Sequence, residues 1–261
     1  MLIGLIGGSG LYEIEELIVF DEKTLTTPFG SPSSPYKIGR IQDAKIAFLA
    51  RHGTPHNIPP HRINYRANIW GFKTLGVERL ISVNAVGGIN KRLNPGDIVI
   101  PDQILDFTFG SRASTFYDGD EVVHVDFTNP YCPEMRDCMT TSSKTKGIQV
   151  VPEGTYICVN GPRLETAKEI DFFSSIGADI VGMTAMPEAV LARELEICMA
   201  ALCVVTNYAA GISRSKLTTT EVVAVMKDSM EKIKSIIKES VKLIPTGRNC
   251  PCKEALKDAG L

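Results

Sequence analysis

Several apolar, strand-like runs end in polar segments rich in glycine, and these segments hold the residues best suited to chemistry. Gly7-Gly8-Ser9-Gly10 follows the run Leu2–Ile6, so its backbone N–H groups and hydroxyl could approach an anion closely. A tight turn is the simpler interpretation of so short a motif. The segment is not a P-loop, because no Gly-Lys-Ser/Thr follows it. It is not a dinucleotide-binding G-x-G-x-x-G either, because Glu13 occupies the third glycine position.

Arg51-His52-Gly53 stands at the end of the next candidate strand, Lys45–Ala50. Ligands of α/β sheets usually bind at this end of a strand. A guanidinium fork suits a phosphate, and His52 could donate a further hydrogen bond. His56 and His61 follow, and a histidine cluster also suggests a metal. Intervening prolines and the lack of an Asp, Glu or Cys within the cluster disfavour that alternative, so we predict no metal site.

Two more strand ends carry groups of the same kind. Asn84-Ala85-Val86-Gly87-Gly88 follows a Val/Ile-rich run and exposes backbone N–H groups. In Gly182-Met183-Thr184, the threonine could contact an anion and the methionine could cover an apolar substrate face. A core methionine and a helix-capping threonine are the alternative. Together with Arg51, these segments predict one pocket lined with phosphate-type donors.

The run Met199–Thr206 ends in a neutral amide, Asn207. An amide offers a donor and an acceptor on one flat group, which matches the edge of a heterocycle, although asparagine is also a common turn residue. No G-x-S-x-G elbow and no paired acidic run of a two-metal site occurs in the sequence.

Composition narrows the classes of partner. The 261 residues include 28 Lys and Arg against 30 Asp and Glu, a formal net charge of −2. This charge argues against a nucleic-acid or an anionic-membrane partner, since both need a basic surface. The longest apolar run, Ile197–Val205, is too short to span a bilayer, and the N-terminus lacks the features of a signal peptide. Seven scattered cysteines, an odd number, predict a reduced, cytoplasmic protein.

Strand-like runs alternate with helical patterns, which predicts an α/β fold with a mixed central β-sheet flanked by helices. We expect one domain over residues 1–245 and a peripheral tail over 246–261. In that tail Cys250-Pro-Cys252 is too closely spaced for a zinc motif. We expect two free thiols in a disordered segment, with a strained redox pair as the alternative. The predicted strands are 2–6, 45–50, 79–84, 97–100, 154–159, 179–182 and 199–206, and the predicted helices are 64–75, 133–146, 165–176, 188–195 and 220–243.

Seven motifs in order give the chain a family resemblance: IGGSG at 6–10, TPFGSPS at 27–33, ARHG at 50–53, NYRANIW at 64–70, GDIVIPDQ at 96–103, GPRLET at 161–166 and GMTAMPEA at 182–189. Over residues 2 to 243 the chain resembles the methylthioadenosine phosphorylase family, the trimeric branch of the purine nucleoside phosphorylases. The resemblance implies a single nucleoside phosphorylase domain. It also implies phosphorolysis of a purine nucleoside in purine and methylthio salvage, with phosphate as co-substrate and no cofactor.

The resemblance also assigns roles to residues. It implies that His56 and Asn207 are catalytic and that Met183 lies beside the ribose. His124 is similar to a histidine that a neighbouring subunit contributes to the sugar site. The chain is accordingly expected to form a homotrimer or a dimer of trimers, with no nucleic acid and no membrane as partner. The phosphate site implied is Ser9, Arg51, His52, Asn84, Ala85 and Thr184; the base is implied to contact Asn207 and Ala209, and the 5′ group Thr166, Thr219 and Val222.

Positions 207 and 209 depart from the adenosine-type pattern, which has Asp-x-Asp there; this chain has Asn207 and Ala209. The O6 of a 6-oxopurine would face an unpaired carboxylate in that pattern, whereas Asn207 can donate to O6 and accept from N7–H. Asn-x-Ala resembles the methylthioinosine phosphorylase subgroup. We therefore predict a preference for 6-oxopurines, methylthioinosine first. The alternatives are a methylthioadenosine phosphorylase and a non-catalytic nucleoside-binding protein.

Overall fold

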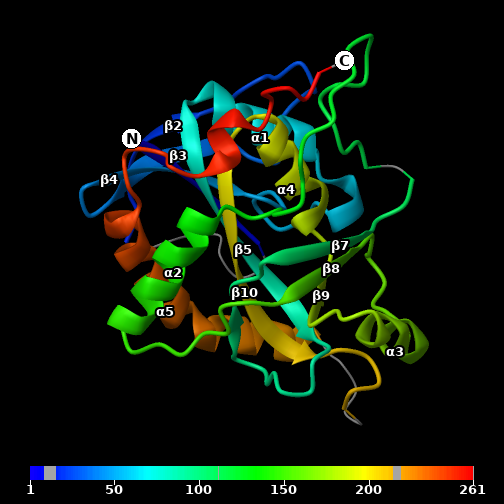
Figure 1. Ribbon diagram of the computed structural model, residues 1–261. Helices are drawn as coiled ribbons and strands as arrows, with labels where there is room; N and C mark the ends of the chain where they lie inside the picture. The colour runs from blue at the N-terminus through cyan, green and yellow to red at the C-terminus, as the bar shows by residue number, and fades with distance from the viewer. Residues whose placement is uncertain (9–15, 111, 214–218, 261) are drawn as a thin grey trace.

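The central sheet forms because several short runs rich in Val, Ile and Ala are apolar on both faces. The computed structural model describes residues 1–8, 16–110, 112–213 and 219–260. Within them, these runs pair as a mixed sheet with helices packed on both sides (Figure 1). Its strands are β1 (Leu2–Gly7), β2 (Ile18–Lys23), β3 (Tyr36–Ile41), β4 (Ala44–Ala50), β5 (Val77–Gly88), β6 (Ile98–Val99), β7 (Gln103–Phe107), β8 (Thr155–Val159), β9 (Ile180–Gly182) and β10 (Cys198–Tyr208).

The strand order is β2-β3-β4-β1-β5-β9-β8-β7, and β10 pairs with β5 and β6. β1 runs parallel to β4 and β5, and β10 runs parallel to β5. In this register Gly7 pairs with both Ala50 and Val83, while Asn84 pairs with Cys203. The carboxyl ends of four strands therefore meet at one edge, as the polar segments that follow them predicted.

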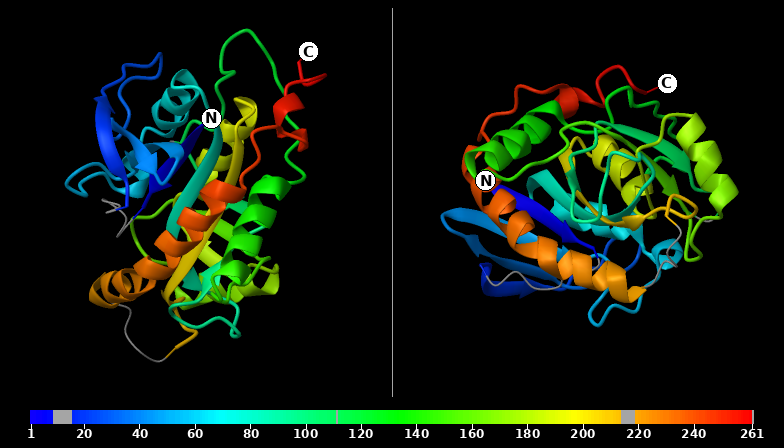
Figure 2. Two further views of the ribbon diagram at one scale, coloured as in Figure 1. Left: turned by 90° about the vertical axis from the view of Figure 1, so that its left-hand side faces the viewer. Right: turned by 90° about the horizontal axis from the view of Figure 1, so that it is seen from below.

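Alternating residues of the strands build two core layers beneath the helices. Ile3 and Leu5 face the layer under α2 and α5, and Ile6 faces the layer under α1 and α4. α2 and α5 lie side by side (Figure 2). The helices are α1 (Tyr65–Thr74), α2 (Pro133–Thr145), α3 (Ala167–Ser175), α4 (Ala185–Glu194) and α5 (Thr219–Leu243), with short 3₁₀ turns η1 (Pro60–Arg62) and η2 (Pro251–Glu254).

The mixed α/β class is confirmed, and the structure adds elements that the sequence prediction lacked. β2, β3 and β7 were not predicted; β2 begins in an apolar run, residues 17–20, that is followed by three charged residues, and is exposed along most of its length. The helix predicted from Glu188 begins at Ala185, and Met186 within it is not helical. A residue before proline is pushed out of the helical region, which accounts for this kink before Pro187. None of the described helices combines the length and apolar character needed to cross a membrane.

The segment 246–261 differs most from its prediction. Cys250 and Cys252, expected as free thiols in a disordered tail, are 4% and 1% exposed and belong to the core layer under α2 and α5. Arg79 reaches this segment from β5 and donates to the carbonyls of Pro245 and Gly247. The tail is therefore attached to the body of the protein by packed side chains and by hydrogen bonds.

Candidate active site

A cavity of about 600 Å³ opens at the shared carboxyl edge of the strands. That volume suits a nucleoside-sized ligand. Its lining combines residues from strand ends far apart in the sequence. Of the residues singled out from the sequence, it contains Arg51, His52, Asn84, Ala85, Met183, Thr184, Asn207 and Val222. The parallel register of β1, β4, β5 and β10 brings together the segments that follow these strands, and the antiparallel pairing of β9 with β5 adds Met183 and Thr184.

Arg51 is buried, and most of its donors are occupied by a partner that the sequence did not reveal. Its Nε and Nη2 donate to the two carboxylate oxygens of Glu188, at 2.5 and 3.0 Å. Burial by itself disfavours the charged guanidinium, but the Glu188 carboxylate outweighs that effect and raises the pKa of Arg51 above its usual value. The pair is therefore ionised and neutral overall.

The remaining donors of Arg51 face the end of β1. Nη2 also donates to Ser82 Oγ and Nη1 to the Val83 carbonyl, so four of the five N–H groups of this guanidinium have acceptors in the described structure. A Cβ atom at Gly8 would lie 2.7 Å from Nη1. Only glycine fits so close to the guanidinium. The remaining N–H of Nη1 therefore lies next to Gly8. Ser9, the first predicted phosphate residue, lies outside the described residues.

Asn84 and Thr184 form a second group of donors in the cavity. Thr184 Oγ1 donates to Asn84 Oδ1 at 3.0 Å, and Asn84 Nδ2 donates to Ser82 Oγ at 3.1 Å. Thr184 precedes α4, yet its side chain accepts no capping hydrogen bond from that helix. The alternative interpretation as a helix cap is therefore wrong. The hydroxyl instead lies among the buried polar groups that line the cavity.

His52 has a defined hydrogen-bond role that differs from the donor expected from sequence. Its Nδ1 lies 2.8 Å from the Ile58 carbonyl, which can only accept, so Nδ1 carries the proton. Burial, and next the positive charge of Arg51, lower the pKa of His52 to about 3. The neutral ring thus presents Nε2 to the cavity as an acceptor, suited to the hydroxyl of a protonated phosphate. His56 stacks on this ring, with centroids 4.3 Å apart.

This buried neutral histidine gives an expected pH dependence of stability. The unfolded chain binds a proton at His52 near pH 6.5 and the folded chain only near pH 3, so stability falls as pH drops through that window. His52→Asn keeps an N–H for the Ile58 carbonyl but has no proton to gain. Urea unfolding at about pH 7 and about pH 4.5 should show a smaller loss of stability for His52→Asn than for wild type. Equal losses would contradict a neutral buried His52.

Asn207 lines the cavity where β10 pairs with Gly87, three residues beyond Asn84 on β5, and keeps unused hydrogen-bonding capacity. Its Oδ1 accepts from Thr206 Oγ1 at 2.9 Å, and one Nδ2 hydrogen goes to the Tyr208 carbonyl at 2.9 Å. An amide can make four hydrogen bonds, so one donor and one acceptor position remain for a ligand. The Val86 carbonyl lies 3.2 Å from the same Thr206 Oγ1, so the single hydroxyl hydrogen is shared between two acceptors.

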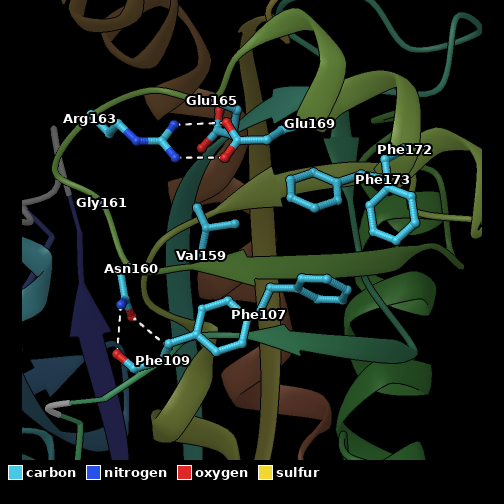
Figure 3. Close-up of a pocket in the computed structure, with 10 residues that line it drawn as sticks. All are labelled: Phe107, Phe109, Val159, Asn160, Gly161, Arg163, Glu165, Glu169, Phe172 and Phe173. Carbon is cyan, nitrogen blue, oxygen red and sulfur yellow. Dashed lines mark hydrogen bonds and ion pairs between the residues drawn. The ribbon is translucent and has the colours of Figure 1, made fainter.

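Glu165 also lines the cavity and was not recognised from the sequence. Burial raises the pKa of its carboxyl. The neighbouring Arg163 is bonded to Glu169 instead, at 2.6 and 2.8 Å, as Figure 3 shows. Glu165 therefore contributes an acceptor that is not neutralised by a bonded cation among the described residues. Glu165 belongs to the GPRLET motif at 161–166, but the family resemblance assigned a substrate contact only to the threonine of that motif.

Four residues assigned by resemblance, Thr166 among them, have described side chains and are not in the lining of this cavity. Ala209 is buried in a small apolar cluster, and the neighbouring Ala210 lines the cavity instead. His56 is exposed beside His52. His124 is exposed and its backbone N–H donates to Ala259, at a distance from the cavity of its own chain. Thr219 begins α5, and its side chain lies outside what the structure describes.

Thr166, predicted to contact the 5′ group, is the N-cap of α3. Its hydroxyl accepts from the Glu169 N–H at 3.1 Å while the Glu169 carboxylate accepts from the Thr166 N–H, a reciprocal capping box. Thr166→Ala should therefore cost about 1 kcal/mol in unfolding free energy. It should leave the ratio of turnover on 5′-methylthio and 5′-hydroxyl nucleosides unchanged. A changed ratio would assign Thr166 to the sugar site instead.

Comparison with known proteins identifies the family of the chain. Residues 2–242 match the family described as the Phosphorylase superfamily. A probable S-methyl-5′-thioinosine phosphorylase of Thermodesulfovibrio yellowstonii is 56% identical, over 98% of this chain and 96% of that protein. A 6-oxopurine nucleoside phosphorylase of Pyrococcus furiosus is 51% identical, over 98% of each chain. Methylthioadenosine phosphorylase of Schistosoma mansoni, solved with adenine, superposes with a TM-score of 0.93 at 32% identity, covering 98% of this chain and 96% of that one. The resemblance seen in the sequence is thus confirmed, and the chain belongs to the phosphorylase superfamily.

Proposed function

We propose that the protein is a purine nucleoside phosphorylase for 6-oxopurine substrates. Its preferred reaction converts S-methyl-5′-thioinosine and phosphate into hypoxanthine and S-methyl-5-thioribose 1-phosphate. The observation that carries this proposal is one cavity that combines anion donors with Asn207 and Glu165. The relatives named for methylthioinosine and 6-oxopurine nucleosides support the same substrate class.

The phosphate site has donors but little net charge. Glu188 neutralises Arg51, so the phosphate is expected to bind mainly through an Nη1–H of Arg51 and through the Thr184 hydroxyl, which would turn from Asn84 Oδ1 to the ligand. His52 Nε2 accepts the phosphate hydroxyl. Ser9 remains a proposed member of this site, as do Asn84 and His56 near the sugar side.

The base site discriminates by hydrogen-bond polarity. A 6-oxopurine presents O6 as an acceptor and N1–H as a donor, while adenine reverses both groups. The free N–H of Asn207 matches O6 and the Glu165 carboxylate matches N1–H, while the free oxygen position of Asn207 matches the N7–H that forms when the departing base is protonated. Adenine would place N1 against Glu165, leaving acceptor against acceptor, which costs about 1–3 kcal/mol.

Catalysis follows from charge development between these two sites. As the bond from C1′ to N9 lengthens, its electron pair moves to the purine and positive charge grows on the sugar. Bound phosphate stabilises that charge, and one of its oxygens forms the new bond to C1′. The negative charge on the purine is stabilised by the Asn207 amide. The base takes up one proton at its ring nitrogen through solvent, and the phosphate gives up its hydroxyl proton as it becomes the sugar phosphate, so the protons balance. This scheme needs no covalent enzyme intermediate and no cofactor.

The sugar side of the cavity determines which 5′ group is accepted, whereas the base is recognised elsewhere in the cavity. Val222 of α5 lines the cavity, which favours a thioether over a hydroxyl at the 5′ position. Its neighbour Val223 is exposed and contributes nothing to this wall. A methylthioadenosine phosphorylase is the second candidate function, since it shares the reaction and differs only at the base.

A second cavity, of about 460 Å³, adjoins the first and supports self-association (Figure 3). Glu165 lines both cavities. Phe109 and Phe172 are 72% and 51% exposed there, around Phe107 and Phe173. An exposed aromatic group of this kind marks an interface. We therefore propose that a second copy of the chain covers these aromatic side chains in a homotrimer, and that this copy contributes its His124 to the sugar site. We propose the cytoplasm as the location of the assembly. Light scattering should give three times the chain mass, or six times for a dimer of trimers.

The experiment that tests the proposed reaction follows phosphorus as well as the base. Purified protein is incubated with methylthioinosine, with and without phosphate, and ³¹P NMR and chromatography detect the products. We expect hypoxanthine and pentose 1-phosphate in equal amounts, and neither without phosphate. Hypoxanthine without a phosphate ester would indicate hydrolysis. Substrate binding without any product would favour the non-catalytic nucleoside-binding alternative.

A further inference from the structure

Four buried cysteines converge at the amino-terminal end of β10, away from the nucleoside cavity. Cys132 is the N-cap of α2, Cys198 is the first residue of β10, and Cys250 and Cys252 flank the start of η2. Their sulfur atoms all lie within 4.8 Å of one another, and the Sγ atoms of Cys198 and Cys250 are 3.3 Å apart. Asn207 is nine positions further along β10, roughly 30 Å away.

The distances between the four sulfur atoms fit a tetrahedral metal site. In a tetrahedral tetrathiolate site, metal–sulfur distances of about 2.3 Å hold the sulfurs about 3.8 Å apart. The cluster fits that arrangement and offers four ligands, which is the full set of a closed, structural site. Sequence spacing concealed it, because only Cys250 and Cys252 are close in the chain and their two partners are more than 50 residues away.

The electrostatic surroundings favour thiolates at this place. Arg79 is fully buried; its Nη1 donates to Cys198 Sγ at 2.9 Å, and its Nη2 lies 3.5 Å from the Glu134 carboxylate, which offsets part of its charge. The amino-terminal end of α2 adds partial positive charge at Cys132. A tetrathiolate bound to a divalent ion has two net negative charges. A buried guanidinium and a helix N-terminus are groups that compensate such charge.

We propose that Cys132, Cys198, Cys250 and Cys252 form a structural site for a thiophilic divalent metal ion such as zinc. The site has no open coordination position, so its function is to join segments. It ties the start of β10, the start of α2 and the tail 246–261 into one unit. This inference is independent of the proposed phosphorolysis, because no residue of the cluster lines the nucleoside cavity.

Disulfide formation is the competing chemistry of the same sulfurs. Each disulfide would remove two electrons and two protons from two thiols and needs an external oxidant. Its bonded sulfurs would lie about 2.05 Å apart, whereas the cysteines here are free thiols. Protein purified under reductant and without chelator distinguishes the two states, since oxidation lowers the intact mass by two hydrogens for each disulfide.

The test combines metal analysis with matched variants. Wild type, Cys132→Ser, Cys252→Ser and Cys138→Ser are purified with reductant, supplied with Zn²⁺ and examined by native mass spectrometry. Cys138 is the control, a half-buried thiol of α2 outside the cluster whose contact with the Leu243 carbonyl serine can keep. We expect one zinc per chain in wild type and in Cys138→Ser, and its loss in the other two. Co²⁺ should give thiolate charge-transfer bands and tetrahedral d–d bands in the same two proteins.

Function and stability are measured on the same samples. Removing the metal should lower the Tm while leaving kcat/KM at room temperature unchanged, because the cluster is remote from the cavity. The proposal would be overturned if the wild-type protein bound no metal while the four cluster cysteines could be alkylated. A wild-type mass showing disulfides under reductant would do so as well, and so would zinc retained by Cys132→Ser and Cys252→Ser. Each of these results leaves the proposed phosphorolysis untouched.

Discussion

Replacing Arg51 with methionine is expected to remove phosphorolysis and to destabilise the fold together. Glu188 is 0% exposed and would lose the cation that holds both of its carboxylate oxygens. An unpaired buried carboxylate costs about 3–5 kcal/mol, which urea unfolding measures. The phosphate would lose the Nη1 donor beside Gly8, so kcat/KM should fall by on the order of 10²–10³.

A double variant separates these two effects. Arg51→Met/Glu188→Leu removes both charges, so it should recover much of the stability lost in the single variant. Turnover should remain as low as in Arg51→Met, since the donor to phosphate is still absent. A double variant that turned over at the wild-type rate would show that Arg51 acts only as the partner of Glu188.

Asn207→Asp is expected to reverse the preference between bases. The carboxylate cannot donate to O6, so kcat/KM on methylthioinosine should fall by about 10–100-fold, equivalent to about 1–3 kcal/mol. It accepts from a 6-amino group, so activity on methylthioadenosine should rise. The measurement is kcat/KM for both substrates at saturating phosphate. If the ratio of the two values is the same in wild type and variant, Asn207 does not read position 6.

Glu165→Gln tests the second contact with the base. The amide retains an acceptor for N1–H and gains a donor for N1 of adenine, so the variant should narrow discrimination by accepting adenine nucleosides better. Glu169→Gln is the matched control, because Glu169 lies next to Glu165 but is bonded to Arg163 and the Thr166 N–H. Its base preference should equal that of wild type.

The sequence predicted that most residues proposed for the phosphate would share one cavity, because a parallel sheet brings the carboxyl ends of its strands together. Arg51, Asn84 and Asn207 follow apolar runs, so their positions in the sheet could be predicted from hydropathy. Glu188 could not be predicted as the partner of Arg51, since 137 residues separate them and only the packing of α4 on the sheet joins them. The orientation of His52 depends on the Ile58 carbonyl in a loop, which hydropathy does not describe.

Strands β2 and β3, a capping box and the cysteine cluster were not predicted either, each for a physical reason. β2 and β3 pair at the edge of the sheet. The apolar start of β2 gives way to three charged residues and β3 alternates apolar with polar residues, so neither strand is as continuously apolar as β1 and β4. The capping box at Thr166 was readable from Thr166 and Glu169, three residues apart, but the family resemblance led to a substrate role instead. The cysteine cluster depends on contacts among three separate segments, which no local pattern encodes.

One competition experiment tests the central claim most directly. Wild-type protein receives equal concentrations of methylthioinosine and methylthioadenosine with excess phosphate, and hypoxanthine and adenine are quantified at early times. The initial ratio of the two bases equals the ratio of the two kcat/KM values. A hydrogen-bond mismatch of about 1–3 kcal/mol predicts a ratio of about 10–100 in favour of hypoxanthine. A ratio near one, or an excess of adenine, would contradict recognition of a 6-oxopurine by Asn207 and Glu165.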